Sequence, residues 1–143
     1  MGAIVTPRMT PKFRRELAMY LTLRYARDLK LVFRKSSKDA RVEIAAAESA
    51  DQNDLVWSPR CSLTALLHEI GHHRLSGHTT PLKGLEEIVE EARAWVWAEW
   101  CAMEEGVWFN YRLAEEKFST YLKAYTKDTG REVPLKIQWR REW

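Results

Sequence analysis

The sequence predicts an α+β fold in a single domain, in which a small three-stranded sheet lies among four helices. With 143 residues, 45% of them apolar, the chain is long enough for one hydrophobic core and too short for two ordinary ones. Four segments carry apolar residues at helical spacing, and three short apolar runs bounded by turn-forming residues follow the first of them. The expected order is therefore one helix, a small sheet and three further helices.

The N-terminal helix is expected over about residues 10–28. Thr10 can cap its first turn, and Pro11 suits a position whose N–H needs no partner inside the helix. The side chains expected to face the core are Phe13, Leu17, Tyr20, Leu21 and Ala26.

The three strands are expected between this helix and the histidine-rich segment. "LKLVFRKSSK" indicates a strand and a polar turn, and "ARVEIAAAE" indicates a second strand. The turn-forming stretch "SADQND" then precedes the short run "DLVWS", which is the third.

Three more helices are expected in the second half of the chain. Ser58 and Pro59 favour a helix start, and that helix should end near Leu75, just before Gly77. The next helix covers residues 85–105 and ends at Gly106, and the last begins at residue 107. We expect one domain over residues 1–143, with a catalytic core at about 29–103 and a C-terminal helix and tail at 107–143. The tail "REVPLKIQWRREW" is predicted to be a strand or an extended arm.

The net charge of +3 is distributed unevenly along the chain. Residues 1–41 contain 11 Lys and Arg against 3 Asp and Glu, whereas the remaining residues are net acidic. A basic N-terminal region can bind nucleic acid or an acidic protein, although a solvated helix face is the simpler interpretation. Without a signal-peptide or membrane-spanning pattern, and with Cys61 and Cys101 far apart, the chain is expected to be cytoplasmic with reduced thiols and no membrane partner.

All four histidines lie in the stretch "HEIGHHRLSGH", residues 68–78. On a helix, His68 and His72 lie one turn apart and 40° around the axis, so both imidazoles can reach one metal ion. Glu69 lies 60° from His72, which suits a general base acting on a water beside that ion. His73 lies 140° from His68 and is expected to point elsewhere.

The third metal ligand has three candidates. Glu91 is preferred because it shares a helix face with small residues, which would let its helix approach the histidine helix near Gly71. Glu87 lies one turn earlier on that face, whereas Glu86 and Glu90 are expected to point toward solvent. His78 has the spacing of the HExxHxxGxxH pattern, but Leu75 occupies the position that needs glycine.

Together, "LTALLHEIGHHRL" and "EEARAWVWA" resemble the two motifs of the ImmA/IrrE-type metallopeptidases, which are compact gluzincins. Over residues 40–103 the resemblance implies a zincin-like domain with one Zn²⁺ held by His68, His72 and Glu91 and with Glu69 as catalytic base. It also implies an edge strand, "RVEIA" or "LVWS", that pairs with an extended substrate. Arg93 stands where the family usually has asparagine, and Trp95 and Ala98 depart from its aromatic–alanine step.

The function implied is that of a zinc metalloendopeptidase whose substrate or partner is a regulatory protein, such as a repressor. Candidate donors to the developing oxyanion are His78, Tyr111 and Arg93. One alternative is a metzincin-like or DNA-associated protease with His78 as third ligand. Another is a non-catalytic module that binds nucleic acid or a protein through the basic N-terminal region.

Overall fold

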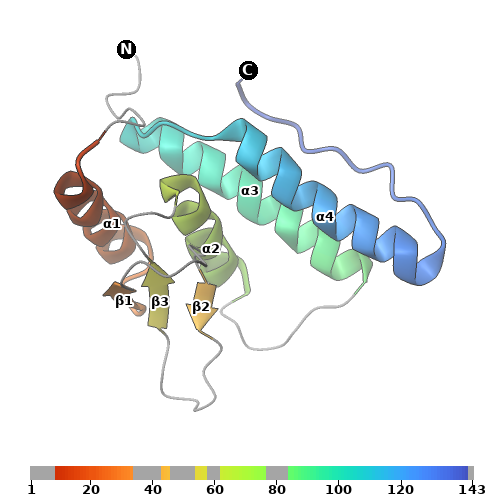
Figure 1. Ribbon diagram of the computed structural model, residues 1–143, viewed down its shortest axis with the longest axis horizontal. Coiled ribbons are helices and arrows are strands. Elements are labelled where there is room, and N and C mark those ends of the chain that lie inside the picture. Colours follow the sequence, from red (N-terminus) through yellow and green to blue (C-terminus); the bar gives the residue numbers. More distant parts are fainter. Residues whose placement is uncertain (1–8, 34–42, 46–53, 58–61, 77–83, 142–143) are drawn as a thin grey trace.

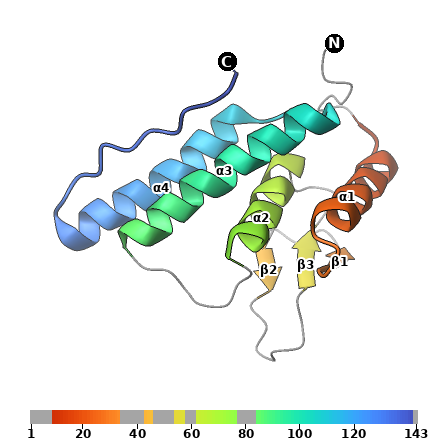
Figure 2. The ribbon, with the colours of Figure 1, turned by 180° about the vertical axis from the view of Figure 1, so that it is seen from behind.

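The computed structural model describes residues 9–33, 43–45, 54–57, 62–76 and 84–141. Its elements, in chain order, are α1 (Pro11–Tyr25), β1 (Lys30–Phe33), β2 (Glu43–Ala45), β3 (Asp54–Trp57), α2 (Leu63–Ser76), α3 (Leu85–Glu105) and α4 (Tyr111–Thr129). Figures 1 and 2 show α2 between two groups of elements: α1 and the strands lie on one side, and the paired helices α3 and α4 lie on the other. The most extensive packing is between α2 and α3.

The predicted α+β fold class is wrong, because the described chain is mainly helical. Its helices have 15, 14, 21 and 19 residues, whereas its strands have only four, three and four. Strands of three or four residues lie at the short end of the range found in globular proteins. They supply Leu55 and Trp57 to the core, and the other large side chains that are fully buried in the described part of the chain belong to helices.

The strands pair in the order β1-β3-β2. β1 is parallel to β3, with Lys30 opposite Asp54, and β2 is antiparallel to β3, with Ile44 opposite Leu55. The strand within "DLVWS" is therefore central and paired on both sides, so it cannot accept a further strand. β2, within "ARVEIAAAE", lies at an edge of this sheet.

Most predicted helix boundaries agree with the structure. Thr10 Oγ1 accepts a hydrogen bond of 3.2 Å from the Phe13 N–H, and α3 ends at Gly106, whose φ of +67° is the left-handed conformation that glycine favours. The last helix begins later than expected, because Asn110 caps it through a 3.1 Å bond from the Leu113 N–H. Ser58, Pro59 and Gly77 lie outside the described residues.

Helix α1 buries a narrower face than its sequence predicts. Ala18, Leu21 and Thr22 are buried, but Phe13 and Tyr20 are 44% and 45% exposed. The Thr22 hydroxyl donates to the Ala18 carbonyl at 2.8 Å, which satisfies its polarity inside the core. Among all described helices, none has both the length and the apolar character needed to cross a lipid bilayer.

The C-terminal tail is an extended arm rather than a strand, and it runs back along α4 (Figures 1 and 2). The carboxylate of Glu99, which is fully buried, holds its end. This carboxylate accepts hydrogen bonds from the Tyr111 hydroxyl at 2.6 Å and from the backbone N–H groups of Arg140 and Arg141 at 2.8 and 3.1 Å. The Tyr111 hydroxyl thus binds the same carboxylate that holds the arm.

Helices α2 and α3 approach each other closely at Gly71. A Cβ atom on Gly71 would lie 2.9 Å from the Ala94 carbonyl oxygen and 3.2 Å from Cε3 of Trp97. The facing side chains of Ala94 and Ala98 are small and fully buried. This confirms the prediction that Gly71 permits the approach of a neighbouring backbone.

Substituting Gly71 by alanine is expected to lower the free energy of unfolding by about 1–3 kcal/mol, because the added methyl group overlaps a backbone oxygen that cannot move alone. Helix propensity acts in the opposite direction, since alanine favours a helix by about 1 kcal/mol over glycine. Urea denaturation measures the net change in the free energy of unfolding. Glu116→Ala, at an exposed position of α4, should stay within about 0.5 kcal/mol of wild type. A Gly71→Ala protein more stable than wild type would contradict the tight packing.

Candidate metal centre

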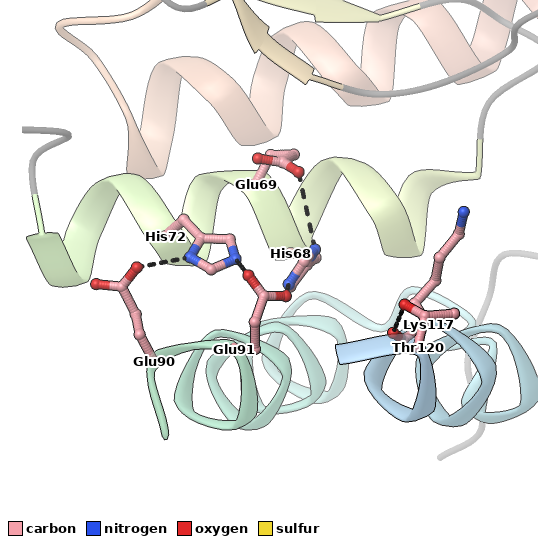
Figure 3. A network of polar contacts seen from close by, with 7 residues as sticks. All are labelled: His68, Glu69, His72, Glu90, Glu91, Lys117 and Thr120. Carbon is pink, nitrogen blue, oxygen red and sulfur yellow. Dashed lines mark hydrogen bonds and ion pairs between the residues drawn. The ribbon is translucent and has the colours of Figure 1, made fainter. Parts of the chain in front are cut away.

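Three side chains from two helices converge between α2 and α3. His68 and His72 come from α2 and Glu91 comes from α3, and one ligand atom from each lies within 4.8 Å of the others. The Nε2 atom of His68 is 3.0 Å from one Glu91 oxygen, and the Nε2 atom of His72 is 2.5 Å from the other (Figure 3). The His68 and Glu91 side chains are 9% and 6% exposed and that of His72 is 12% exposed, so the group is almost closed to solvent.

Local helical geometry explains why these atoms meet. The two histidines are four residues apart, and their ring centroids are 4.5 Å apart on one face of α2. Glu91 precedes Ala94 by one turn of α3, and the close contact at Gly71 brings that face of α3 against α2. The structure thus brings together all three preferred ligand candidates.

Charge and burial act against each other in this group. Burial alone would raise the pKa of Glu91, but hydrogen bonds with His68 and His72 lower it to about 2. Burial would lower the pKa of His72, but the hydrogen bond with Glu91 and the negative charges of Glu91 and Glu69 raise it to about 9. For the more deeply buried His68, burial dominates and its pKa is lowered. Glu91 and His72 therefore form an ion pair, with His68 neutral.

This ion pair predicts how the stability of the protein stripped of metal by EDTA depends on pH. The pKa of His72 is raised from 6.5 to about 9, so its contribution is complete below pH 6.5 and is lost as pH rises through 9. The pKa of Glu91 is lowered from 4.5 to about 2, so its contribution is complete above pH 4.5 and is lost as pH falls through 2. Urea unfolding should therefore show a larger stability difference between wild type and His72→Gln at pH 5.5 than at pH 9. Equal differences would exclude the ion pair.

The carboxylate of Glu69 lies beside His68 rather than among the three grouped donors. Its Oε1 atom is 3.9 Å from Nδ1 of His68, and its side chain is 22% exposed. Figure 3 shows this carboxylate apart from that of Glu91, with the His68 ring between them. Glu69 is thus close to the group and more open to solvent than any of its three members.

Two side chains orient the histidine rings, and the sequence reasoning did not assign either of them this role. Trp95 stacks on His68, with ring centroids 3.7 Å apart and planes within 5°. Glu90 was expected to point toward solvent, which is wrong: its Oε2 atom lies 3.0 Å from Nδ1 of His72. The contact of Trp95 with the histidines could have been predicted, because Trp95 lies on the same face of α3 as Glu91. The spacing of Glu90 did not indicate its contact with His72.

A third unexpected side chain, Tyr121, reaches the group from α4. Burial and the negative charges of Glu91, Glu69 and Glu87 raise the pKa of Tyr121, as does its hydrogen bond with Glu91. The hydroxyl therefore keeps its proton at neutral pH and remains a donor. Figure 3 shows Lys117 and Thr120 of the same helix to one side of the group, where the Thr120 hydroxyl donates to the Lys117 backbone carbonyl.

The remaining sequence candidates do not join the group. Glu87 is exposed and is not among the three converging donors, and His78 lies outside the described residues. His73 points elsewhere, as predicted, and its Nε2 atom is 2.8 Å from the Asp28 carboxylate. Arg93 is exposed on α3 and lines an open groove that also contains Trp97.

The three converging donors fit one zinc ion. Two imidazole nitrogens and one carboxylate oxygen form a donor set found in catalytic zinc sites. Ligand atoms around tetrahedral zinc lie roughly 3.3–3.6 Å apart, so separations of 3.0 and 2.5 Å require only a small outward movement. No family model, curated protein or solved structure matches this chain.

Proposed function

We propose that this protein is a zinc-dependent metalloendopeptidase in which His68, His72 and Glu91 hold one Zn²⁺ ion. The observation that supports the proposal best is the convergence of these three donors beside Glu69, with both histidines on the helix that carries the HExxH pattern. A structural zinc site is less consistent with this donor set, because such sites usually have four protein ligands that include cysteine. The one cysteine described, Cys101, is buried on α3, and burial raises its pKa to about 12.

Each side chain has a role in the proposed reaction. When bound, zinc supplies Lewis acidity that polarises a peptide carbonyl and lowers the pKa of water. Glu69 takes a proton from the attacking water and passes it to the leaving nitrogen, a role that its greater exposure permits. The neutral hydroxyl of Tyr121 can donate a hydrogen bond to the oxyanion. Tyr121 replaces Tyr111 as candidate because its hydrogen-bond partner, Glu91, belongs to the group of three donors, whereas Tyr111 binds Glu99.

The proposed substrate is an extended segment of a regulatory protein, such as a repressor, in the cytoplasm. Among the described strands β2 lies at an edge of the sheet, so its outer side can pair with a substrate backbone, whereas the central β3 cannot. The family resemblance in the two motifs is the reason for preferring a regulatory protein over bulk digestion.

Metal content and peptide cleavage together test this proposal. Purified protein should carry about one zinc per chain by mass spectrometry of the metal. It should cleave members of a diverse peptide library, with products identified by mass spectrometry, and a zinc chelator should abolish that cleavage until zinc is restored. Protein that binds no zinc, or cleavage that survives chelation, would refute the function.

A further inference from the structure

The His72 ring has a carboxylate at each of its two nitrogens. Its Nε2 atom faces Glu91, and its Nδ1 atom lies 3.0 Å from Oε2 of Glu90. Figure 3 shows the two carboxylates on opposite sides of the ring, although they belong to consecutive residues of α3. The side chain of Glu90 is 20% exposed, so it closes the outer side of the group.

The contact at Nδ1 determines which nitrogen of a neutral imidazole can bind a metal. A carboxylate accepts hydrogen bonds and does not donate them, so the Nδ1 atom facing Glu90 carries the hydrogen. A neutral ring with its hydrogen on Nδ1 has its lone pair on Nε2, the atom that faces the other two donors. Glu90 therefore favours the form of His72 that is competent to bind zinc.

Among the residues that the structure describes, no carboxylate lies within hydrogen-bond distance of Nδ1 of His68. Its Nδ1 atom is 3.9 Å from Oε1 of Glu69, which is too long for a hydrogen bond, and its ring is oriented by stacking on Trp95. The two histidines are thus held by different means, and a carboxylate orients only one of them. A change at Glu90 should act through His72 alone.

We propose that Glu90 is a positioning residue, which orients the His72 ring and fixes its hydrogen on Nδ1 so that Nε2 binds zinc. This inference rests on the zinc site of the proposed function but not on peptidase activity. A carboxylate behind a histidine ligand also makes the imidazole more basic, and removal of such a partner weakens metal binding by about 10–100-fold.

Zinc affinity measured by competition with a chromogenic chelator tests the proposal. Glu90→Ala should bind zinc about 10–100 times more weakly than wild type. Glu86→Ala is the matched control, because Glu86 is exposed one turn earlier on the same helix, and its affinity should not change. NMR of the zinc-loaded protein adds a readout that general loosening of the fold would not mimic: the slowly exchanging Nδ1–H signal of His72 should be lost in Glu90→Ala, while the signals of the His68 ring remain.

The possible outcomes separate this inference from the proposed function. Equal zinc affinities and an unchanged Nδ1–H signal in Glu90→Ala would overturn the role of Glu90, while the zinc site itself would stand. A wild-type protein that binds no zinc would overturn both. If Glu90→Ala loses its helical circular dichroism, Glu90→Gln replaces it. The amide oxygen of glutamine still accepts a hydrogen bond but carries no charge. The Glu90→Gln protein should therefore bind zinc more weakly than wild type and Glu86→Ala, but by less than about tenfold.

Discussion

The Glu69→Gln variant is expected to cleave peptide substrate about 10²–10⁴ times more slowly than wild type while binding zinc with unchanged affinity. Glutamine has almost the same shape as glutamate but cannot take a proton from water at neutral pH. Because the Glu69 carboxylate lies outside the group of three donors, its replacement leaves all the proposed ligands in place. The measurements are kcat/KM for one identified peptide and the zinc content of the same protein sample.

Glu116→Gln provides the matched control for this experiment, because it makes the same chemical change at an exposed position of α4. It should retain both activity and zinc. If Glu69→Gln keeps wild-type activity, another group is the base, and if it loses zinc, Glu69 is a ligand. The first result would contradict the catalytic role, and the second would contradict the ligand assignment.

Local periodicity was sufficient to predict how the two histidines are placed relative to each other. His68 and His72 share a face of α2 because four residues make slightly more than one helical turn, whatever surrounds the helix. The choice of Glu91 required a second inference, that small residues on α3 and a glycine on α2 mark a close crossing. Such residues are a readable signal, because a larger side chain at Gly71 would collide with the Ala94 backbone.

Periodicity could not predict the roles of residues whose contacts depend on how a neighbouring element packs. Glu90 is rotated by 100° from Glu91, which indicates solvent for an isolated helix. Its side chain is nevertheless long enough to reach around the edge of the crossing to His72. The sequence alone made Tyr111 a candidate oxyanion donor. In the structure its hydroxyl donates to the buried Glu99 carboxylate, which also binds the C-terminal arm at Arg140.

The prediction of the fold class was wrong for a related reason. The sequence locates apolar runs such as "DLVWS", but the length over which they pair depends on partners that lie elsewhere in the chain. Here each pairing covers only three or four residues, and the core is formed by α2 packed between α1 and α3. Among the described strands, this sheet has β1 and β2 at its edges, so the proposed pairing of β2 with a substrate does not depend on the fold class.

Replacing Glu91 with alanine is expected to have the largest effect on zinc. The change removes one of three proposed ligands, so affinity should fall by more than the 10–100-fold typical of a residue behind a ligand, to at least about 10³-fold. It also removes the group whose hydrogen bond and charge raise the pKa of His72, so that pKa should fall in the protein without metal. Chelator competition measures the first effect, and NMR titration of the histidine ring measures the second.

Two further variants decide between the ligand candidates, because each of the alternatives predicts a different pattern. Glu87→Ala changes an exposed carboxylate one turn from Glu91 and should leave zinc affinity unchanged. His78→Ala should likewise leave it unchanged if Glu91 completes the site. Loss of zinc in His78→Ala with retention in Glu91→Ala would instead favour the HExxHxxGxxH arrangement, despite the leucine at position 75. In that case the contacts of Glu91 with both histidines would be a salt-bridge network that supports the fold, and the pH dependence of stability would remain while the metal assignment moved to His78.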